Sequence, residues 1–218
     1  MNGPTYSICL DVGAEQDYSV FTILRRLQNM EPDPARDKDT IGLPHYGLVY
    51  LEQMPLKTRY PDVYERAEYI HKSVRGDCHF LVDATGVGNP VVQSLRHLSP
   101  IPIVIVSGLT VNARENGGYN VPKREIVTAL QGVMHSRRLQ IAKGLPHQEQ
   151  LKKEILSFKM RPRDSGNIEY GAASERIHDD MVMSLAINIW YNERMYGYKM
   201  EADLLKQEEA YDPFEAYA

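Results

Sequence analysis

The 218-residue sequence contains little of what marks several large classes of protein. Its only cysteines, Cys9 and Cys78, lie in or beside expected strands. Two cysteines are too few for a disulfide framework or a cysteine zinc site. We expect both to be small core residues of a protein in a reducing compartment. No run of about 18 apolar residues occurs, so we expect no membrane span. No Walker-type loop occurs, so we expect no ATP motor in this chain. The net charge of −4 argues weakly against a nucleic-acid partner, although the distribution of charge matters more than its sum.

What the sequence does contain begins with an apolar run at residues 6–13, which ends in Asp11 and Gly13. Its length, its partly β-branched and aromatic composition and the closing glycine predict a buried strand. Near-continuous apolar strands are typical of a parallel or mixed sheet covered on both faces, in which ligands bind outside the strand ends. A carboxylate at this position is costly unless something pairs with it. We expect the partner to be a divalent metal ion.

The same pattern occurs a second time at residues 78–90. An apolar strand ends in Asp83, a turn with Gly86 and Gly88 follows, and a helix is expected at 91–98. The glycines allow a close backbone approach, but their spacing matches no nucleotide-binding loop. Asp83 is therefore either a second site carboxylate or a plain cap of the following helix.

A third acidic position precedes an apolar helix expected at 181–190. Its polar start is His178, Asp179 and Asp180, where carboxylates also gain from the helix dipole. Adjacent helical residues point about 100° apart, so we expect Asp180 to be the inner ligand, Asp179 an outer or alternate ligand and His178 a hydrogen-bonding support. Asp17 is either a turn-former or a further contributor to the same site.

The remaining pattern predicts one domain over residues 1–195, followed by an acidic, tyrosine-rich tail at 196–218. Surface loops are expected at 30–44 and 108–118. The other expected elements are strands at 18–24, 46–53, 101–106 and 138–142, helices at 61–75, 122–137 and 146–156, and a hairpin over 158–170.

Basic residues gather between positions 123 and 163, where ten lysines and arginines face three glutamates. A local positive surface suits a DNA phosphate backbone, which accepts charge without a sequence being read. The alternative is a solvated helix face with cations near helix ends. The candidate DNA contacts are Arg124, Arg137, Arg138, Lys159, Arg161 and Arg163.

Four motifs in order resemble the nuclease domain of the large terminase subunit of tailed bacteriophages, a member of the ribonuclease-H-like superfamily. They lie at residues 10–13, 82–88, 122–124 and 178–182, and the resemblance covers about residues 5 to 192. It implies an α/β fold with a mixed central sheet and helices on both faces. It also implies that Asp11, Asp83 and Asp180 hold two divalent ions, with an extra Asp in some members where Asp17 stands.

The resemblance implies partners as well. The family protein carries an N-terminal ATPase domain that drives packaging, and it works with the portal and the small terminase subunit in the cytoplasm of the infected bacterial host. This chain lacks that ATPase, so we expect an isolated nuclease domain with no membrane partner.

The resulting hypothesis is a two-metal endonuclease for double-stranded DNA with little sequence preference, since nothing resembles a base-reading helix. Asp11 would bridge two Mg²⁺ or Mn²⁺ ions, with Asp83 on one and Asp180 on the other, because oxygen ligands favour these metals over zinc. Lys123 would meet the scissile phosphate or occupy a surface position.

Three rival hypotheses stay open. A Holliday-junction resolvase or a ribonuclease H has the same fold. A non-catalytic DNA-binding assembly module would have no need of carboxylates at all three places. An actin-like or sugar-kinase ATPase begins similarly, but it needs two lobes and a second phosphate loop.

Overall fold

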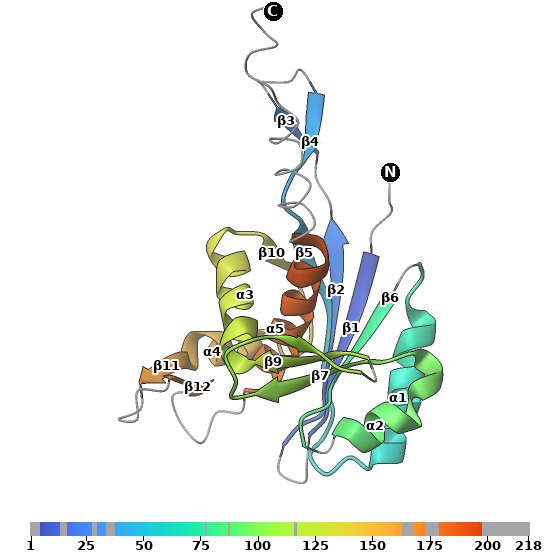
Figure 1. Ribbon diagram of the computed structural model, residues 1–218. Helices are drawn as coiled ribbons and strands as arrows, with labels where there is room; N and C mark the ends of the chain where they lie inside the picture. The colour runs from blue at the N-terminus through green and yellow to red at the C-terminus, as the bar shows by residue number, and fades with distance from the viewer. Residues whose placement is uncertain are drawn as a thin grey trace, which may run out of the picture.

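The computed structural model describes residues 5–13, 17–27, 30–33, 38–76, 78–86, 88–115, 117–162, 168–172 and 179–197. Within these ranges the chain forms one eight-stranded mixed sheet with the order β10-β5-β2-β1-β6-β7-β9-β8 (Figure 1). Neighbours β1, β2 and β5 are antiparallel, whereas β6, β7 and β9 continue from β1 in parallel. The strands are β1 (Thr5–Asp11), β2 (Val20–Leu27), β5 (His45–Gln53), β6 (Cys78–Asp83), β7 (Ile101–Val106), β8 (Asn112–Ala113), β9 (Tyr119–Pro122) and β10 (Leu139–Ile141).

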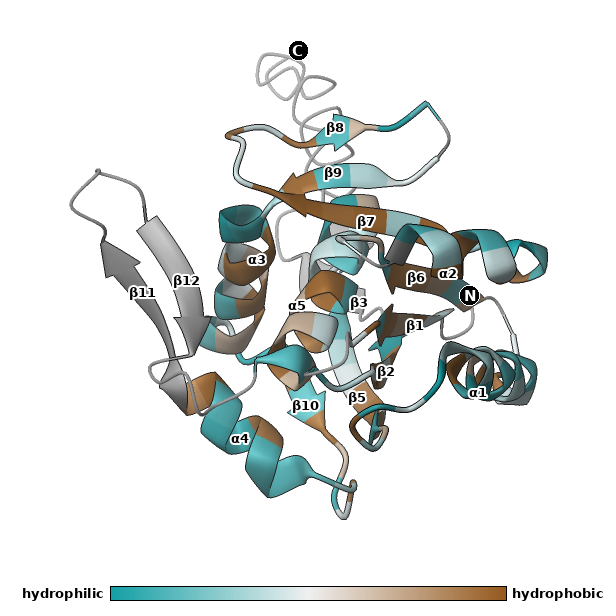
Figure 2. Ribbon diagram, turned by 90° about the horizontal axis from the view of Figure 1, so that it is seen from below, coloured by the Kyte–Doolittle hydropathy of each residue, from teal (hydrophilic) through white to brown (hydrophobic). Residues whose placement is uncertain are grey.

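Helices cover both faces of this sheet (Figure 1). One face carries α1 (Tyr60–Ser73), α2 (Gly88–Ser94) and the 3-10 turn η1 (Arg96–Leu98). The other carries α3 (Lys123–His135), α4 (Gln148–Ser157) and α5 (Asp180–Asn192). Figure 2 shows apolar ribbon on β1, β6 and β7 between the layers and mostly polar ribbon on the outer helices α1 and α4. The predicted mixed α/β sheet with helices on both faces is confirmed.

The alternation of side chains along β1 builds two separate cores. Ile8 and Leu10 face α1 and α2, whereas Cys9 belongs to the core beneath α5. This follows from the two-residue period of a strand, and it shows that both faces of β1 are covered. Cys9 is fully buried and Cys78 partly buried, and both thiols are free, as expected for small core residues.

Helix α5 is enclosed on all sides. Each residue from Met181 to Asn192 is buried, because α5 lies on β1 and β2 while α3 and α4 pack against its outer side. This explains the almost uncharged sequence of the segment. Among the described residues, no helix combines the length and apolarity that crossing a bilayer requires.

Two segments that we predicted as loops contain strands, so those two predictions are wrong in part. Residues 30–44 include the hairpin of β3 (Met30–Asp33) and β4 (Lys38–Ile41), and residues 108–118 include β8. Strand pairing uses backbone groups, so a polar segment without apolar alternation gives no signal for it. Gly118 precedes β9 with φ +75°, and a Cβ there would collide with the carbonyl of Pro102 on β7. Only glycine fits that approach.

Two further hairpin strands, β11 (Phe158–Pro162) and β12 (Ile168–Ala172), pair antiparallel as predicted for 158–170. After α5 the chain makes the π-helical turn η2 (Glu193–Gly197). Residues 198–218 lie outside the described ranges, so the tail stays a prediction.

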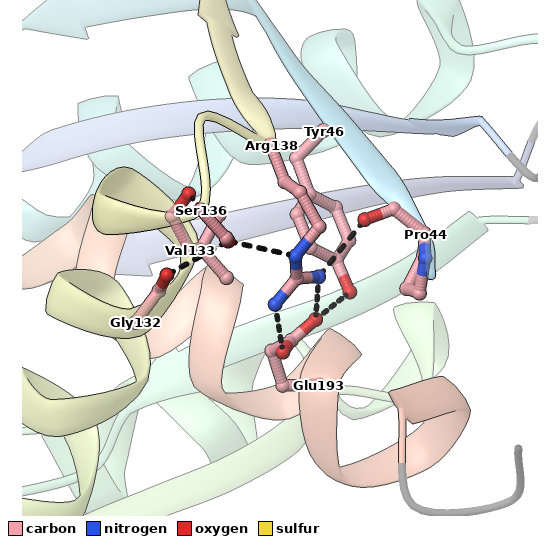
Figure 3. Close-up of polar contacts among 7 residues, drawn as sticks. All are labelled: Pro44, Tyr46, Gly132, Val133, Ser136, Arg138 and Glu193. Atoms are coloured by element: carbon pink, nitrogen blue, oxygen red, sulfur yellow. Dashed lines mark hydrogen bonds and ion pairs between the residues drawn. The ribbon is translucent and has the colours of Figure 1, made fainter. Parts of the chain in front are cut away.

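Arg138 fastens η2 to the sheet edge (Figure 3). Arg138 is only 8% exposed, and its Nη1 and Nη2 donate to the two carboxylate oxygens of Glu193 at 2.7 Å each. Its Nη1 also donates to the carbonyl of Pro44 at 2.9 Å and its Nε to Oγ of Ser136 at 2.9 Å. Tyr46 donates its hydroxyl to Glu193 at 2.6 Å, and burial together with the Glu193 charge raises the pKa of Tyr46. Arg138, predicted as a DNA contact, therefore holds the fold together, and we leave it out of the DNA surface.

Replacing Arg138 by alanine is expected to lower the free energy of unfolding by about 2–4 kcal/mol, because it leaves the Glu193 carboxylate without its bidentate partner. Urea denaturation followed by circular dichroism measures this loss. The matched control is Arg137→Ala at the exposed neighbouring position, for which we expect a change within about 0.5 kcal/mol. Equal effects of the two substitutions would contradict the structural role of Arg138.

Candidate active site

Asp11 and Asp83 lie side by side at one edge of the sheet. Strands β1 and β6 run in parallel, and their register pairs Leu10 with Val82, so the two aspartates are the next positions along. Each stands two residues after a side chain of the core beneath α5, namely Cys9 on β1 and Leu81 on β6. Because side chains alternate along a strand, both carboxylates point toward the α5 face.

Asp180 reaches the same edge from the helical layer. It is the first residue of α5, and its Oδ2 accepts a hydrogen bond from the backbone N–H of Tyr18 at 3.2 Å, just before β2 begins. This contact ties the start of α5 to the segment that follows Asp11 in the chain. Asp180 thus lies at the point where β1, β2 and α5 meet.

Asp179 and Lys123 form a second pair beside Asp180. Asp179 occupies the N-cap position of α5 without capping it through its side chain, and its Oδ2 lies 3.3 Å from Nζ of Lys123. Lys123 is the first residue of α3, and both side chains are about one-third exposed. The lysine contributes to the site electrostatically, since its charge also lowers the pKa of Asp83.

The charges of these carboxylates act on one another. Burial raises the pKa of Asp11 well above its ordinary value, and the charges of Asp83, Asp180, Asp179 and Asp17 raise it further, in that order. Burial also raises the pKa of Asp83, although the Thr85 N–H, which donates to Oδ1 at 2.8 Å, opposes the shift. Like charges at this edge therefore disfavour full ionisation of Asp11.

These carboxylates are neighbours without forming a closed ligand shell. Among the described residues, no three His, Cys, Asp or Glu side chains stand close enough to hold one metal ion in common. The structure brings Asp11, Asp83 and Asp180 to one edge, which is the arrangement that the strand-end motifs predict.

Gly13 and residues 17–19, in the described parts of the connection between β1 and β2, lie beside this site. A Cβ at Gly13 would collide with the carbonyl of Asp17, so this turn requires glycine. The N–H of Gly13 donates to Oγ of Ser19 at 3.2 Å. Asp17 is exposed at the bend, and its charge is the smallest of the four that act on Asp11. Asp17 is thus a rim residue near the site.

Glu154 is a carboxylate of this region that the sequence reading did not single out. It is 2% exposed on α4, and its Oε2 accepts a hydrogen bond from the backbone N–H of Val182 at 3.1 Å. Burial, with the Asp180 and Asp179 charges, raises the pKa of Glu154 to about 7. The available signal was its spacing, because Glu154 lies one turn after the buried Leu151 on an amphipathic helix.

The predicted DNA contacts are distributed more widely. Arg124 is exposed on α3 and donates to the carbonyl of Leu109 at 2.6 Å, and Arg137 is exposed just after α3. Lys159 and Arg161 lie on β11, of which the structure describes the backbone. His178 and Arg163 lie outside the described residues.

Comparison with known proteins gives the same architecture. No family model matches the chain. It is 27% identical over 200 residues to the large terminase subunits of Thermus virus P23-45 and Thermus phage G20c, which covers 90% of this chain and 33% of each relative. The chain thus spans one-third of the length of these curated relatives.

Solved structures extend the comparison. The large terminase nuclease of the thermophilic phage G20c matches with a TM-score of 0.58 and 21% identity, over 86% of this chain and 82% of that one. The same nuclease with bound magnesium matches at 22% identity, a TM-score of 0.58, and coverage of 87% and 82%. The fold is therefore ribonuclease-H-like. Within that class, the predicted resemblance to the nuclease domain of the phage large terminase subunit is confirmed.

Glu154 should make the stability of the metal-free protein depend on pH. Its pKa is about 7 in the folded state against an ordinary value of 4.5, so between these pH values the folded protein holds a proton that the unfolded chain has released. The free energy of unfolding therefore falls as the pH rises through this window, with a contribution from Glu154 of about 3 kcal/mol.

Urea denaturation from pH 4.5 to 8 in a chelator measures this effect. Glu154→Gln is expected to show a shallower fall than the wild type, while Glu149→Gln, at an exposed position of the same helix, keeps the wild-type slope. An unchanged slope in Glu154→Gln would contradict the assignment.

Proposed function

We propose that this chain is a metal-dependent endonuclease that cuts double-stranded DNA during viral genome packaging. The observation that carries the proposal is that Asp11, Asp83 and Asp180 lie at one edge of the sheet, where their charges act on one another. That edge belongs to a fold shared with a terminase nuclease. A buried group of like charges is unfavourable for stability, and its presence is explained by a function that needs it.

The donor chemistry fits divalent metal ions. Oxygen ligands from carboxylates suit Mg²⁺ or Mn²⁺, and a cation would relieve the repulsion that raises the Asp11 pKa. Asp11, between the other two, would contribute to both of two ions, with Asp83 and Asp180 each completing one. Divalent ions held by these residues would supply two things to the reaction: activation of a water and stabilisation of the leaving oxygen of the phosphodiester. The G20c nuclease with bound magnesium and with bound cobalt supports a divalent-metal requirement.

The surrounding contacts orient the carboxylates. The Thr85 N–H holds Asp83 and the Tyr18 N–H holds Asp180, each through one carboxylate oxygen. Each of these aspartates is thus held at the site in a defined orientation. Lys123 balances Asp179 and stands where it can meet a DNA phosphate next to the site.

The proposed substrate is the DNA duplex, held through its backbone. Arg124 and Arg137 on the α3 side and the basic hairpin β11–β12 provide cations that contact phosphates without reading bases. The resemblance to the terminase family implies a full assembly with an ATPase domain, the portal and the small terminase subunit in the host cytoplasm, and we include these partners in the proposal.

Substitution of the three carboxylates provides the direct test. Asp11→Ala, Asp83→Ala and Asp180→Ala are each expected to abolish nicking of a supercoiled plasmid in Mn²⁺. Asp179→Ala is expected to lose only about 10- to 100-fold, as for a residue that supports a ligand. Asp62→Ala, on the exposed first turn of α1, is the control and keeps wild-type activity.

Retained nicking in Asp11→Ala or Asp83→Ala would refute the site. A panel of duplex, four-way junction and RNA–DNA hybrid substrates separates the proposal from its relatives of the same fold. Preference for the junction would indicate a resolvase, and preference for the hybrid a ribonuclease H. Wild-type binding to DNA without cleavage of any substrate would indicate an assembly module.

Metal binding has a readout that is independent of cleavage. Asp11→Asn removes a charge that its neighbours repel, so the metal-free variant is expected to unfold at a higher temperature than the wild type at pH 8. Mn²⁺ should raise the unfolding temperature of the wild type and have a much smaller effect on Asp11→Asn. Equal metal-induced shifts in both proteins would contradict the proposed ligand set.

A further inference from the structure

A row of buried polar side chains lies between α5 and the sheet. Asp180, Ser184, Asn188 and Asn192 follow one another at intervals of four residues, so they share one side of the helix. Ser184, Asn188 and Asn192 are at most 1% exposed, as are Ser7 on β1 and Thr22 on β2. We call these five buried residues the polar seam. The three seam residues of α5 form one polar stripe along the helix, and Asp180 is the first residue of that stripe.

Asn188 is the centre of the polar seam. Its Nδ2 donates to the carbonyls of Ser7 and Thr22 at 3.1 and 3.3 Å, and its Oδ1 accepts from Oγ of Ser7 at 2.5 Å. One side chain of α5 therefore bonds to two adjacent strands at the same time. Asn192 extends the network, since its Nδ2 donates to Oγ of Ser7 at 2.7 Å.

Ser184 repeats the connection one turn closer to the active site. Its Oγ donates to the carbonyl of Cys9 at 3.3 Å, and it lies 3.0 Å from Oγ1 of Thr22. Cys9 is two residues before Asp11 on β1. The helix is thus bonded to the strand that carries the central carboxylate, next to that carboxylate.

We propose that Asn188, supported by Ser184, is a positioning residue that sets how far along the sheet α5 lies and how it is rotated, and thereby brings Asp180 to the carboxylates of Asp11 and Asp83. Apolar contacts are not directional, so an apolar helix would pack nearly as well after a small slide or rotation. Hydrogen bonds tolerate no such change, because a shift by one residue moves donors by about 1.5 Å and rotates them by about 100°.

Because α5 is a continuous helix, the position of Asn188 and Ser184 also fixes the position of Asp180. Asp180 lies eight residues before Asn188, about 12 Å along a continuous helix, and four residues before Ser184. Buried polar networks contribute little net stability compared with apolar packing of the same shape, but they can select one arrangement. If the polar seam positions α5, a substitution in it should change the placement of Asp180 more than the free energy of unfolding.

The test uses Asn188→Leu, which keeps the size of the side chain and removes its hydrogen bonds. The readout is amide hydrogen exchange of Tyr18 in the metal-free protein, because this N–H donates to Asp180. Exchange in Asn188→Leu is expected to be as fast as in the reference variant Asp180→Ala, in a protein that remains folded by circular dichroism at the temperature of the experiment.

Two further variants complete the experiment. Ser184→Ala, a smaller change that preserves folding if Asn188→Leu does not, is expected to accelerate Tyr18 exchange in the same direction. Ile187→Val trims a fully buried apolar residue of α5 without touching the polar seam, and we expect Tyr18 exchange as slow as in the wild type. Slow exchange in both seam variants, or equally fast exchange in Ile187→Val, would overturn the proposal.

The catalytic consequence rests on the proposed nuclease function. In Asn188→Leu, we expect the misplacement of Asp180 to lower kcat for plasmid nicking about 100-fold and to leave KM unchanged. Wild-type kcat in Asn188→Leu would overturn the catalytic part of the proposal. If the wild-type protein cleaves no DNA, the function fails, and Tyr18 exchange still decides whether the polar seam places Asp180.

Discussion

Repulsion among carboxylates at one edge of the sheet is the constraint on which the rest of the structure depends. Asp11 is partly buried beside the charges of Asp83, Asp180 and Asp179, and its burial together with these charges raises its pKa. The chain brings these groups together from β1, β6 and the start of α5, against their mutual electrostatic free energy. In the proposed nuclease, divalent cations would offset this electrostatic cost, so the same clustered charges would favour metal binding.

The remainder of the fold opposes the tendency of these charges to move apart. Strands β1 and β6 are central neighbours in the sheet, so hydrogen bonding fixes the separation of Asp11 and Asp83. Helix α5 has no such ladder of backbone hydrogen bonds to the sheet, and polar contacts along its length hold it in place. Glu154 accepts from the first turn, the polar seam bonds the middle to β1 and β2, and the Arg138–Glu193 pair fastens η2 beyond the helix.

The positions of the strand-end carboxylates could be predicted because their signal is local. An apolar run indicates the strand, and the aspartate and glycine that follow indicate where it ends. Arg138, Glu154 and the polar seam could not be assigned in the same way, since their roles depend on partners distant in the sequence. In the sequence, nothing distinguishes Arg138 from the other basic residues, because its partner Glu193 lies 55 positions later. The β3–β4 hairpin was missed because backbone pairing leaves no pattern in polar side chains.

The central claim is that acidic groups from β1, β6 and α5 bind metal ions together, and crystals grown with Mn²⁺ test it most directly. Anomalous scattering at the manganese edge locates the ions without reference to any activity. Manganese peaks are expected within about 2–2.5 Å of carboxylate oxygens of Asp11, Asp83 and Asp180, with Asp11 touching both ions. Manganese absent from this edge, or bound without Asp11, in a protein that nicks DNA would contradict this claim.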